Sequence, residues 1–90
     1  MKRYYILFEG RVQQVGFRSF VAMIAIRHQL TGTVQNLDNG MVACYLQGKQ
    51  ENINHTLDII LKGNQFIHVT NYRLKEVPFQ KQEHKFVILY

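Results

Sequence analysis

The chain has 90 residues, of which 47% are apolar, 12% are aromatic and only one is a proline. A chain of this size buries roughly 60–65% of its unfolded surface, so we expect a single domain over residues 1–90 and exclude a disordered tail. Eleven basic against six acidic residues give a formal charge of +5, which favours anionic partners such as phosphorylated small molecules or nucleic acid.

The first part of the chain predicts a strand followed by a helix. Residues 4–12 are rich in aromatic and β-branched side chains, and Gly10 marks the end of this strand or a bulge in it. A helix is expected over residues 18–29, because apolar residues then recur at the spacing of one helical face. These apolar residues are Phe17, Phe20, Val21, Ile24 and Ala25.

The middle of the chain predicts a β-hairpin. Residues 33–37 and 41–46 form two short apolar segments, and Asn39-Gly40 between them supplies the chemistry of a tight turn. Cys44 lies among apolar residues at alternating positions of the second segment. We therefore expect it to be a small core residue.

The second half of the chain adds another helix and two strands. Apolar residues at helical spacing from Ile53 to Leu61 predict the helix, and Gly63 is placed to end it in a left-handed conformation. Residues 66–77 and 86–89 predict strands, the last of them short. The order βαββαβ with a small extra strand predicts an α+β, ferredoxin-like sandwich, with two helices on one face of an antiparallel sheet.

Two further features of the sequence indicate the cellular compartment of the protein. Cys44 is the only cysteine, so neither an internal disulfide nor a cysteine-based metal site is expected. The apolar run near the amino terminus has five residues and stops at Glu9, which is too short for a signal peptide or a membrane span. We therefore expect a cytoplasmic protein that makes no contact with a membrane.

The segment Gly10–Ser19, with the sequence GRVQQVGFRS, joins the first strand to the first helix. It is not a Walker loop, since five residues separate its two glycines and Phe-Arg follows where that motif needs Lys-Ser/Thr. It also resembles the aromatic signature of an RNA-recognition motif only weakly. Those aromatic residues must lie on a sheet strand to stack bases, whereas Phe17 and Phe20 recur at helical spacing.

Two motifs in the chain resemble the acylphosphatase family. Members carry a segment close to GRVQGVGFR after the first strand and G-x-V-x-N on the second, and this chain has GRVQQVGFR at residues 10–18 and GTVQN at residues 32–36. The resemblance extends over the whole chain in length and element order. It implies a ferredoxin-like fold and hydrolysis of acyl phosphates, with Arg18 and Asn36 at the matching catalytic positions.

The residues between the first strand and the first helix suit an anion. A loop at the start of a helix presents unpaired backbone N–H groups, and the helix dipole adds about half a positive charge there. Arg18 is expected to add a two-pronged donor to phosphoryl oxygens, which a lysine cannot reproduce. The predicted phosphate-binding loop consists of Gln13, Gln14, Val15, Gly16, Phe17 and Arg18.

Hydrolysis of an acyl phosphate needs no acid to protonate the leaving group, because the conjugate acid of a carboxylate has a pKa near about 4. The transition state of phosphoryl transfer is loose and depends on positioning and charge stabilisation. Asn36 can orient the attacking water, although local sequence equally favours an asparagine that stabilises the turn. We therefore expect direct water attack, without a covalent intermediate, a metal or another cofactor.

The other reactive side chains are expected to have structural roles. The histidines are dispersed without the spacing of metal ligands. They are His28, His55, His68 and His84. Ser19 has no neighbouring base in the sequence, so we expect it to support the start of the helix rather than act as a nucleophile.

Gln14 stands where the family usually has a glycine. If the backbone is left-handed at this position, a side chain there costs roughly 1–2 kcal/mol, although the N–H remains available to a phosphate. Thr33 and Gln35 replace the large aromatic and the basic residue common in the family. We expect these departures to affect rate or substrate preference and to leave Arg18 and Asn36 in place.

The leading hypothesis is a small monomeric acylphosphatase that acts on an acyl phosphate and releases inorganic phosphate. An alternative is a catalytically weak anion- or RNA-binding module of the same fold, with nucleic acid the less favoured partner. A third is a regulatory or assembly domain like the one attached to larger carbamoyltransferase proteins of hydrogenase maturation. The end of the chain at Tyr90 argues against this third hypothesis.

Overall fold

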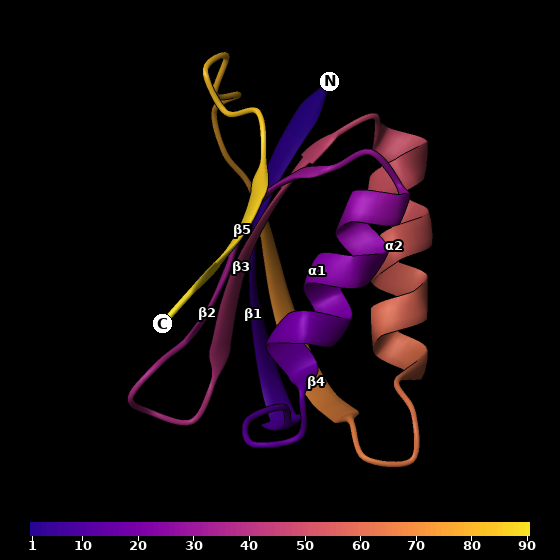
Figure 1. Cartoon of the computed structure of the whole chain (residues 1–90), viewed down its shortest axis with the longest axis vertical. Coiled ribbons are helices and arrows are strands. Elements are labelled where there is room, and N and C mark those ends of the chain that lie inside the picture. Colours follow the sequence, from indigo (N-terminus) through magenta and orange to yellow (C-terminus); the bar gives the residue numbers. More distant parts are fainter.

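The computed structural model describes all residues from Met1 to Tyr90 and contains five strands and two helices (Figure 1). In chain order these elements are β1 (Lys2–Arg11), α1 (Phe17–Arg27), β2 (Thr31–Asn36), β3 (Val42–Gly48), α2 (Gln50–Lys62), β4 (His68–Glu76) and β5 (Phe86–Leu89). Every element expected from the sequence is present, and β5 has the predicted bounds.

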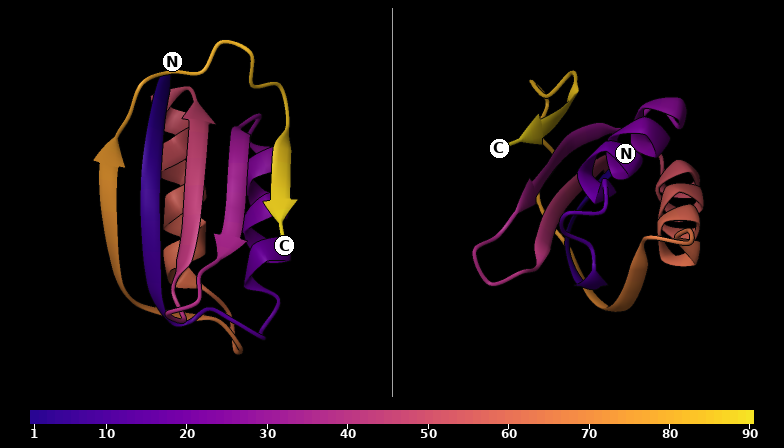
Figure 2. Two further views of the ribbon diagram at one scale, coloured as in Figure 1. Left: turned by 90° about the vertical axis from the view of Figure 1, so that its left-hand side faces the viewer. Right: turned by 60° about the horizontal axis from the view of Figure 1, so that its bottom comes forward.

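The five strands form one sheet in the order β4-β1-β3-β2-β5, and both helices cover the same face of it (Figure 2). The first four strands pair antiparallel with one another, so the predicted α+β, ferredoxin-like arrangement is confirmed. The sheet is nevertheless mixed rather than antiparallel throughout, since β5 lies parallel to β2. The reason is the connection over residues 77–85, which crosses one end of the sheet and enters β5 from the end at which β2 begins (Figure 2).

Most element boundaries differ from the prediction by one or two residues, and two of these differences have a clear local reason. α1 ends at Arg27 rather than at residue 29, because Gln29 has a φ of 55°, in the left-handed region that ends helices. β4 begins at His68 rather than at residue 66. The side-chain oxygen of Asn64 accepts from the N–H groups of residues 66 and 67, so these residues belong to a turn.

Gly10 lies at a bulge in β1, which was one of its two predicted roles. The register between β1 and β4 shifts between Glu9 and Gly10. Gly10 has a φ of 123°, and a Cβ added there would collide with the backbone oxygen of His68. The close approach of β4 at this point therefore requires a glycine.

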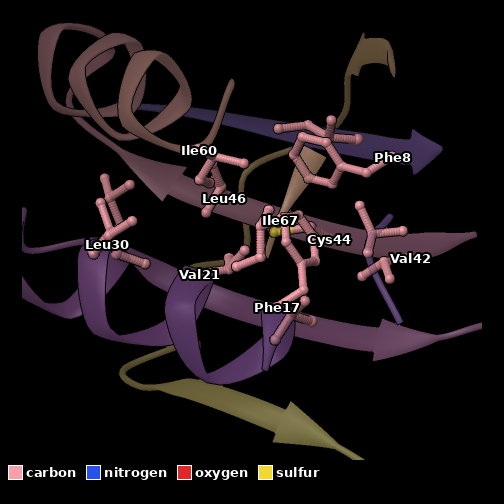
Figure 3. Packing of buried hydrophobic residues seen from close by; sticks show 14 of the residues in the cluster. Phe8, Phe17, Val21, Leu30, Val42, Cys44, Leu46, Ile60 and Ile67 are labelled. Carbon is pink, nitrogen blue, oxygen red and sulfur yellow. The ribbon is translucent and has the colours of Figure 1, made fainter. Parts of the chain in front are cut away.

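A cluster of 15 buried hydrophobic residues fills the space between the helices and the sheet (Figure 3). Phe8 on β1 and Phe17 at the start of α1 meet edge to face, with ring centroids 5.3 Å apart. Cys44 is fully buried, as expected, and desolvation raises the pKa of its thiol. Because Phe17 is anchored in this core, the loop before it and Arg18 after it are held at the edge of the core.

Side-chain contacts to β1 and β3 hold the connection over residues 77–85 in place. Arg3 donates to Glu83 at 3.1 Å, and both side chains are largely buried. The carboxamide of Gln47 donates to the carbonyl of Gln80 at 2.9 Å and accepts from its N–H at 2.8 Å. These contacts fix the path by which the chain reaches β5.

Candidate active site

A cavity of about 140 Å³ lies where the start of α1, the end of β2 and the end of β5 approach one another. Five residues that the sequence assigned to the site line it. They are Gln14, Gly16, Phe17, Arg18 and Asn36. The structure therefore brings the two sequence motifs together at one place.

Arg18 occupies the first turn of α1 and is half-buried. Its Nη1 donates to the carbonyl oxygen of Leu89 at 3.0 Å, and its guanidinium carbon lies 4.7 Å from the centroid of the Tyr90 ring. A guanidinium has five N–H donors. One donor holds the side chain to the end of β5. No other hydrogen bond within the protein uses the guanidinium, and Arg18 lines the cavity.

The loop before α1 reverses the chain through two residues with a positive φ. Gln14 has a φ of 62° and Gly16 has a φ of 76°. The backbone of Gln14 is therefore in the left-handed region, where a residue with a Cβ is disfavoured by about 1–2 kcal/mol. The condition stated for a cost at Gln14, a left-handed backbone, is therefore met.

The start of α1 leaves its backbone N–H groups without partners in the protein. Gly16 precedes the helix without a side-chain capping bond, and the first turn holds no acidic residue. The first bond of the helix runs from the N–H of Phe20 to the carbonyl of Gly16, so the N–H groups of residues 17–19 have no helical acceptor. Together with the helix dipole, these donors form a site for an anion.

Two members of the predicted loop have side chains outside the cavity. The carboxamide of Gln13 donates to the carbonyl oxygens of Leu37 and Met41, both at 2.9 Å, and so ties the loop to the hairpin between β2 and β3. Val15 is half-buried and packs against the core. Neither side chain can contact a ligand in the cavity, so any part they have in binding is through the backbone.

Asn36 is the last residue of β2 and lines the cavity. Its Oδ1 is buried and has no hydrogen-bond partner. An unpaired buried amide oxygen costs about 1–3 kcal/mol and requires an explanation in a native structure. Stabilisation of the turn is not that explanation, because the side-chain bond in the turn comes from Asn39, whose Oδ1 accepts from the N–H of Met41 at 3.0 Å.

Four residues that the sequence did not assign to the site also line the cavity. They are Val12, Ser19, Ile88 and Tyr90. Val12 and Ser19 directly flank the predicted loop, so a loop longer by one residue at each end would have included them. Ile88 and Tyr90 have no such local signal, since only the pairing of β5 with β2 brings them here. Ser19 does not support α1 in the expected way, because the helix has no side-chain capping bond.

The histidines lie away from the cavity lining. His28, directly after α1, and His55 on α2 are neighbours, with ring centroids 6.3 Å apart. No group of three or more His, Cys, Asp or Glu side chains is placed to hold a metal ion. Neither helix is long and apolar enough to cross a membrane.

The aromatic residues that resembled an RNA-recognition signature lie on α1, as their helical spacing predicted. Phe17 is buried in the core, and Phe20 is half-buried against it. A base therefore cannot stack on these rings in the manner of that motif.

Comparisons with known proteins agree with the resemblance of the two motifs. The family model described as Acylphosphatase matches residues 4–88. A protein of Clostridium acetobutylicum named Acylphosphatase is 41% identical over 90 residues, which cover 100% of this chain and 99% of that protein. The crystal structure of acylphosphatase from Bacillus subtilis has a TM-score of 0.94 and 36% identity, with 100% of both chains covered. The crystal structure of HypF from T. kodakarensis also matches, with a TM-score of 0.87 and 33% identity. This match covers 100% of the present chain but only 12% of the HypF chain.

Proposed function

The chain belongs to the acylphosphatase family and hydrolyses acyl phosphates, and we propose that Arg18, the loop N–H groups and Asn36 carry out this reaction in the cavity. One observation carries the proposal. A guanidinium, an uncapped helix start and an unpaired amide converge on the same cavity of about 140 Å³. The first two groups suit a phosphoryl group, and the third suits a water.

The phosphoryl group binds at the start of α1. Its oxygens accept from the backbone N–H groups of the loop and of the first helical turn, and from the free donors of the Arg18 guanidinium. The bond from Arg18 to the carbonyl of Leu89 fixes the side chain before the substrate arrives. Little reorganisation is then needed as charge develops on the phosphoryl oxygens in the transition state.

Water attacks phosphorus directly in the proposed reaction. A bond forms from the water oxygen to phosphorus while the bond from phosphorus to the acyl oxygen breaks, and the acyl group leaves as a carboxylate with the electron pair. Both water protons end on inorganic phosphate, the first through a phosphoryl oxygen. Asn36 orients the water through its carboxamide, whose Nδ2 donates to an oxygen of the water or the substrate. Its Oδ1, which is buried in the structure, accepts one hydrogen of the water once the amide has turned toward the cavity.

Purified protein is expected to hydrolyse benzoyl phosphate at the same rate before and after treatment with EDTA, because no proposed step uses a metal. Inorganic phosphate should inhibit competitively, since it binds the same loop. Turnover is measured by the loss of benzoyl phosphate absorbance, and folding is checked by circular dichroism.

Two results would contradict this prediction. A folded protein without turnover above background would overturn the proposed function, and turnover that EDTA removes and a divalent cation restores would overturn the metal-free mechanism. Association with RNA that weakens with salt and survives Arg18→Ala would favour the binding-module alternative.

Tyr90 is expected to position Arg18 by placing its ring near the guanidinium. An exposed contact of this kind contributes about 0.5–1 kcal/mol, so Tyr90→Ala should lower kcat/KM for benzoyl phosphate by roughly 2- to 5-fold. Tyr90→Phe keeps the ring and should retain the wild-type value. If Tyr90→Phe loses as much as Tyr90→Ala, the hydroxyl rather than the ring is responsible and this role is wrong.

A single chain is proposed to be the working unit. The groups that the proposed mechanism uses, Arg18, the N–H groups at the start of α1 and Asn36, lie together within one chain, and no proposed step calls for a further residue. We expect the protein to elute as a monomer in size-exclusion chromatography at concentrations where it is active.

A further inference from the structure

We propose that the carboxamide of Gln14 donates a hydrogen bond to the acyl carbonyl oxygen of the substrate, and that Gln14 thereby distinguishes acyl phosphates from inorganic phosphate. The inference rests on the proposed function and extends it from the phosphoryl group to the acyl group. Two observations on the residue itself carry it, its backbone conformation and the surroundings of its side chain.

The backbone of Gln14 keeps a conformation that its side chain disfavours. Six glycines have a positive φ, and only two other residues do, Gln14 at 62° and Gln29 at 55°. Left-handed residues that carry a side chain are uncommon, and at ligand sites such strain is often part of the function. We therefore expect a side chain that is kept in this conformation at the edge of a cavity to have a function there.

The surroundings of Gln14 leave its carboxamide free for a ligand. Gln14 is exposed and lines the cavity, and its side chain makes no hydrogen bond within the protein. The neighbouring Gln13 is different, since its carboxamide already donates to two carbonyl oxygens of the hairpin. Of these two adjacent glutamines, only Gln14 is available to a substrate.

The chemistry of an acyl phosphate indicates which atom the carboxamide binds. The loop N–H groups and Arg18 supply donors to the phosphoryl oxygens. The acyl side has one polar atom common to every substrate of the class, the carbonyl oxygen, which only accepts hydrogen bonds. The NH2 of Gln14 is a donor and matches it. Inorganic phosphate has no such atom, so the contact is specific to the acyl compound.

Three variants separate the side chain from the backbone. Gln14→Gly removes both the carboxamide and the left-handed strain, whereas Gln14→Met removes the carboxamide and keeps a side chain of similar length. Gln29→Gly is the matched control, because Gln29 is a glutamine with the same sign of φ at the end of α1, outside the cavity lining. Its carboxamide donates to the carbonyl of Arg27 at 2.9 Å.

The affinities of acetonylphosphonate and of inorganic phosphate are measured by calorimetry. Acetonylphosphonate is a non-hydrolysable analogue in which a CH2 group replaces the oxygen between the acyl carbon and phosphorus, so its carbonyl oxygen keeps the position that it has in an acyl phosphate. Loss of one neutral hydrogen bond should weaken acetonylphosphonate binding by roughly 3- to 10-fold in both Gln14 variants and leave phosphate binding unchanged. The melting temperature should rise by about 2–6 °C in Gln14→Gly, because relief of the strain exceeds the entropy gained by the unfolded chain. Gln14→Met should not show this rise, and Gln29→Gly should bind both ligands like the wild type.

Two outcomes overturn the assignment. Parallel loss of phosphate and acetonylphosphonate affinity would mean that Gln14 serves the phosphoryl group, and unchanged affinity in Gln14→Met would mean that its carboxamide binds nothing. Because these are binding measurements, their failure is distinct from failure of the proposed function, which would appear as a wild-type protein that binds both ligands without turnover of benzoyl phosphate.

Discussion

Arg18→Ala is expected to lower kcat for benzoyl phosphate by roughly 100- to 1000-fold, because removal of one preorganised donor to a developing oxyanion costs about 2.7–4 kcal/mol. The same substitution should raise the inhibition constant of inorganic phosphate, since the guanidinium also binds the ground-state phosphoryl group. Arg18→Lys keeps the positive charge but lacks the planar guanidinium, which also donates to the carbonyl of Leu89. Its kcat should therefore lie between that of Arg18→Ala and that of the wild type. Steady-state kinetics with phosphate as inhibitor measure both effects.

Arg27→Ala is the matched control for this result. Arg27 lies in the last turn of the same helix and is exposed, at the opposite end from the cavity. Its removal lowers the net charge by the same amount and should leave the rate unchanged. A loss of less than 10-fold in Arg18→Ala, or an equal loss in Arg27→Ala, would contradict a direct role for the Arg18 guanidinium.

Asn36→Ala is expected to lower kcat by roughly 100-fold and to leave the inhibition constant of phosphate unchanged, because the amide acts on the water rather than on the bound phosphoryl group. Its effect on folding should also be unusual for a partly buried polar residue. The Oδ1 of Asn36 is buried without a partner, so its removal relieves a desolvation cost of about 1–3 kcal/mol and should not destabilise the protein. Kinetics and urea unfolding test the two parts separately.

Asn39→Ala provides the contrast for Asn36→Ala. The Oδ1 of Asn39 accepts from the N–H of Met41 in the turn, so its loss should reduce stability by about 0.5–1.5 kcal/mol and leave kcat unchanged. Asn36→Ala should therefore lower kcat without lowering stability, whereas Asn39→Ala should lower stability without lowering kcat. If Asn36→Ala weakens phosphate binding as much as Arg18→Ala does, the division of roles between water and phosphoryl group is wrong.

The local part of the site could be predicted from the sequence because it depends on neighbours along the chain. Helical spacing from Phe17 onward placed the start of α1, and with it the uncapped N–H groups and Arg18. The β2–β3 hairpin followed from the Asn39-Gly40 turn, and it places Asn36 at the end of β2. These elements form under short-range rules of spacing and turn chemistry.

The remaining wall of the cavity could not be predicted because it depends on contacts far apart in the chain. Ile88 and Tyr90 reach the site only because β5 pairs parallel with β2. That pairing follows from the path of residues 77–85, which is fixed by Arg3 with Glu83 and by the Gln47 bonds to this connection. No local pattern indicates which end of the sheet such a connection crosses.

The hydrogen bond from Arg18 to Leu89 joins residues 71 positions apart, and this separation determines when a newly made molecule can become active. The chain is synthesised from its amino terminus at about 5–20 residues per second, so α1 is made seconds before β5. Contacts between residues so far apart in the sequence form late in folding, because the intervening chain must first be ordered. We therefore expect a nascent chain to bind phosphate only weakly and to remain inactive until its last strand has been released and has paired with β2.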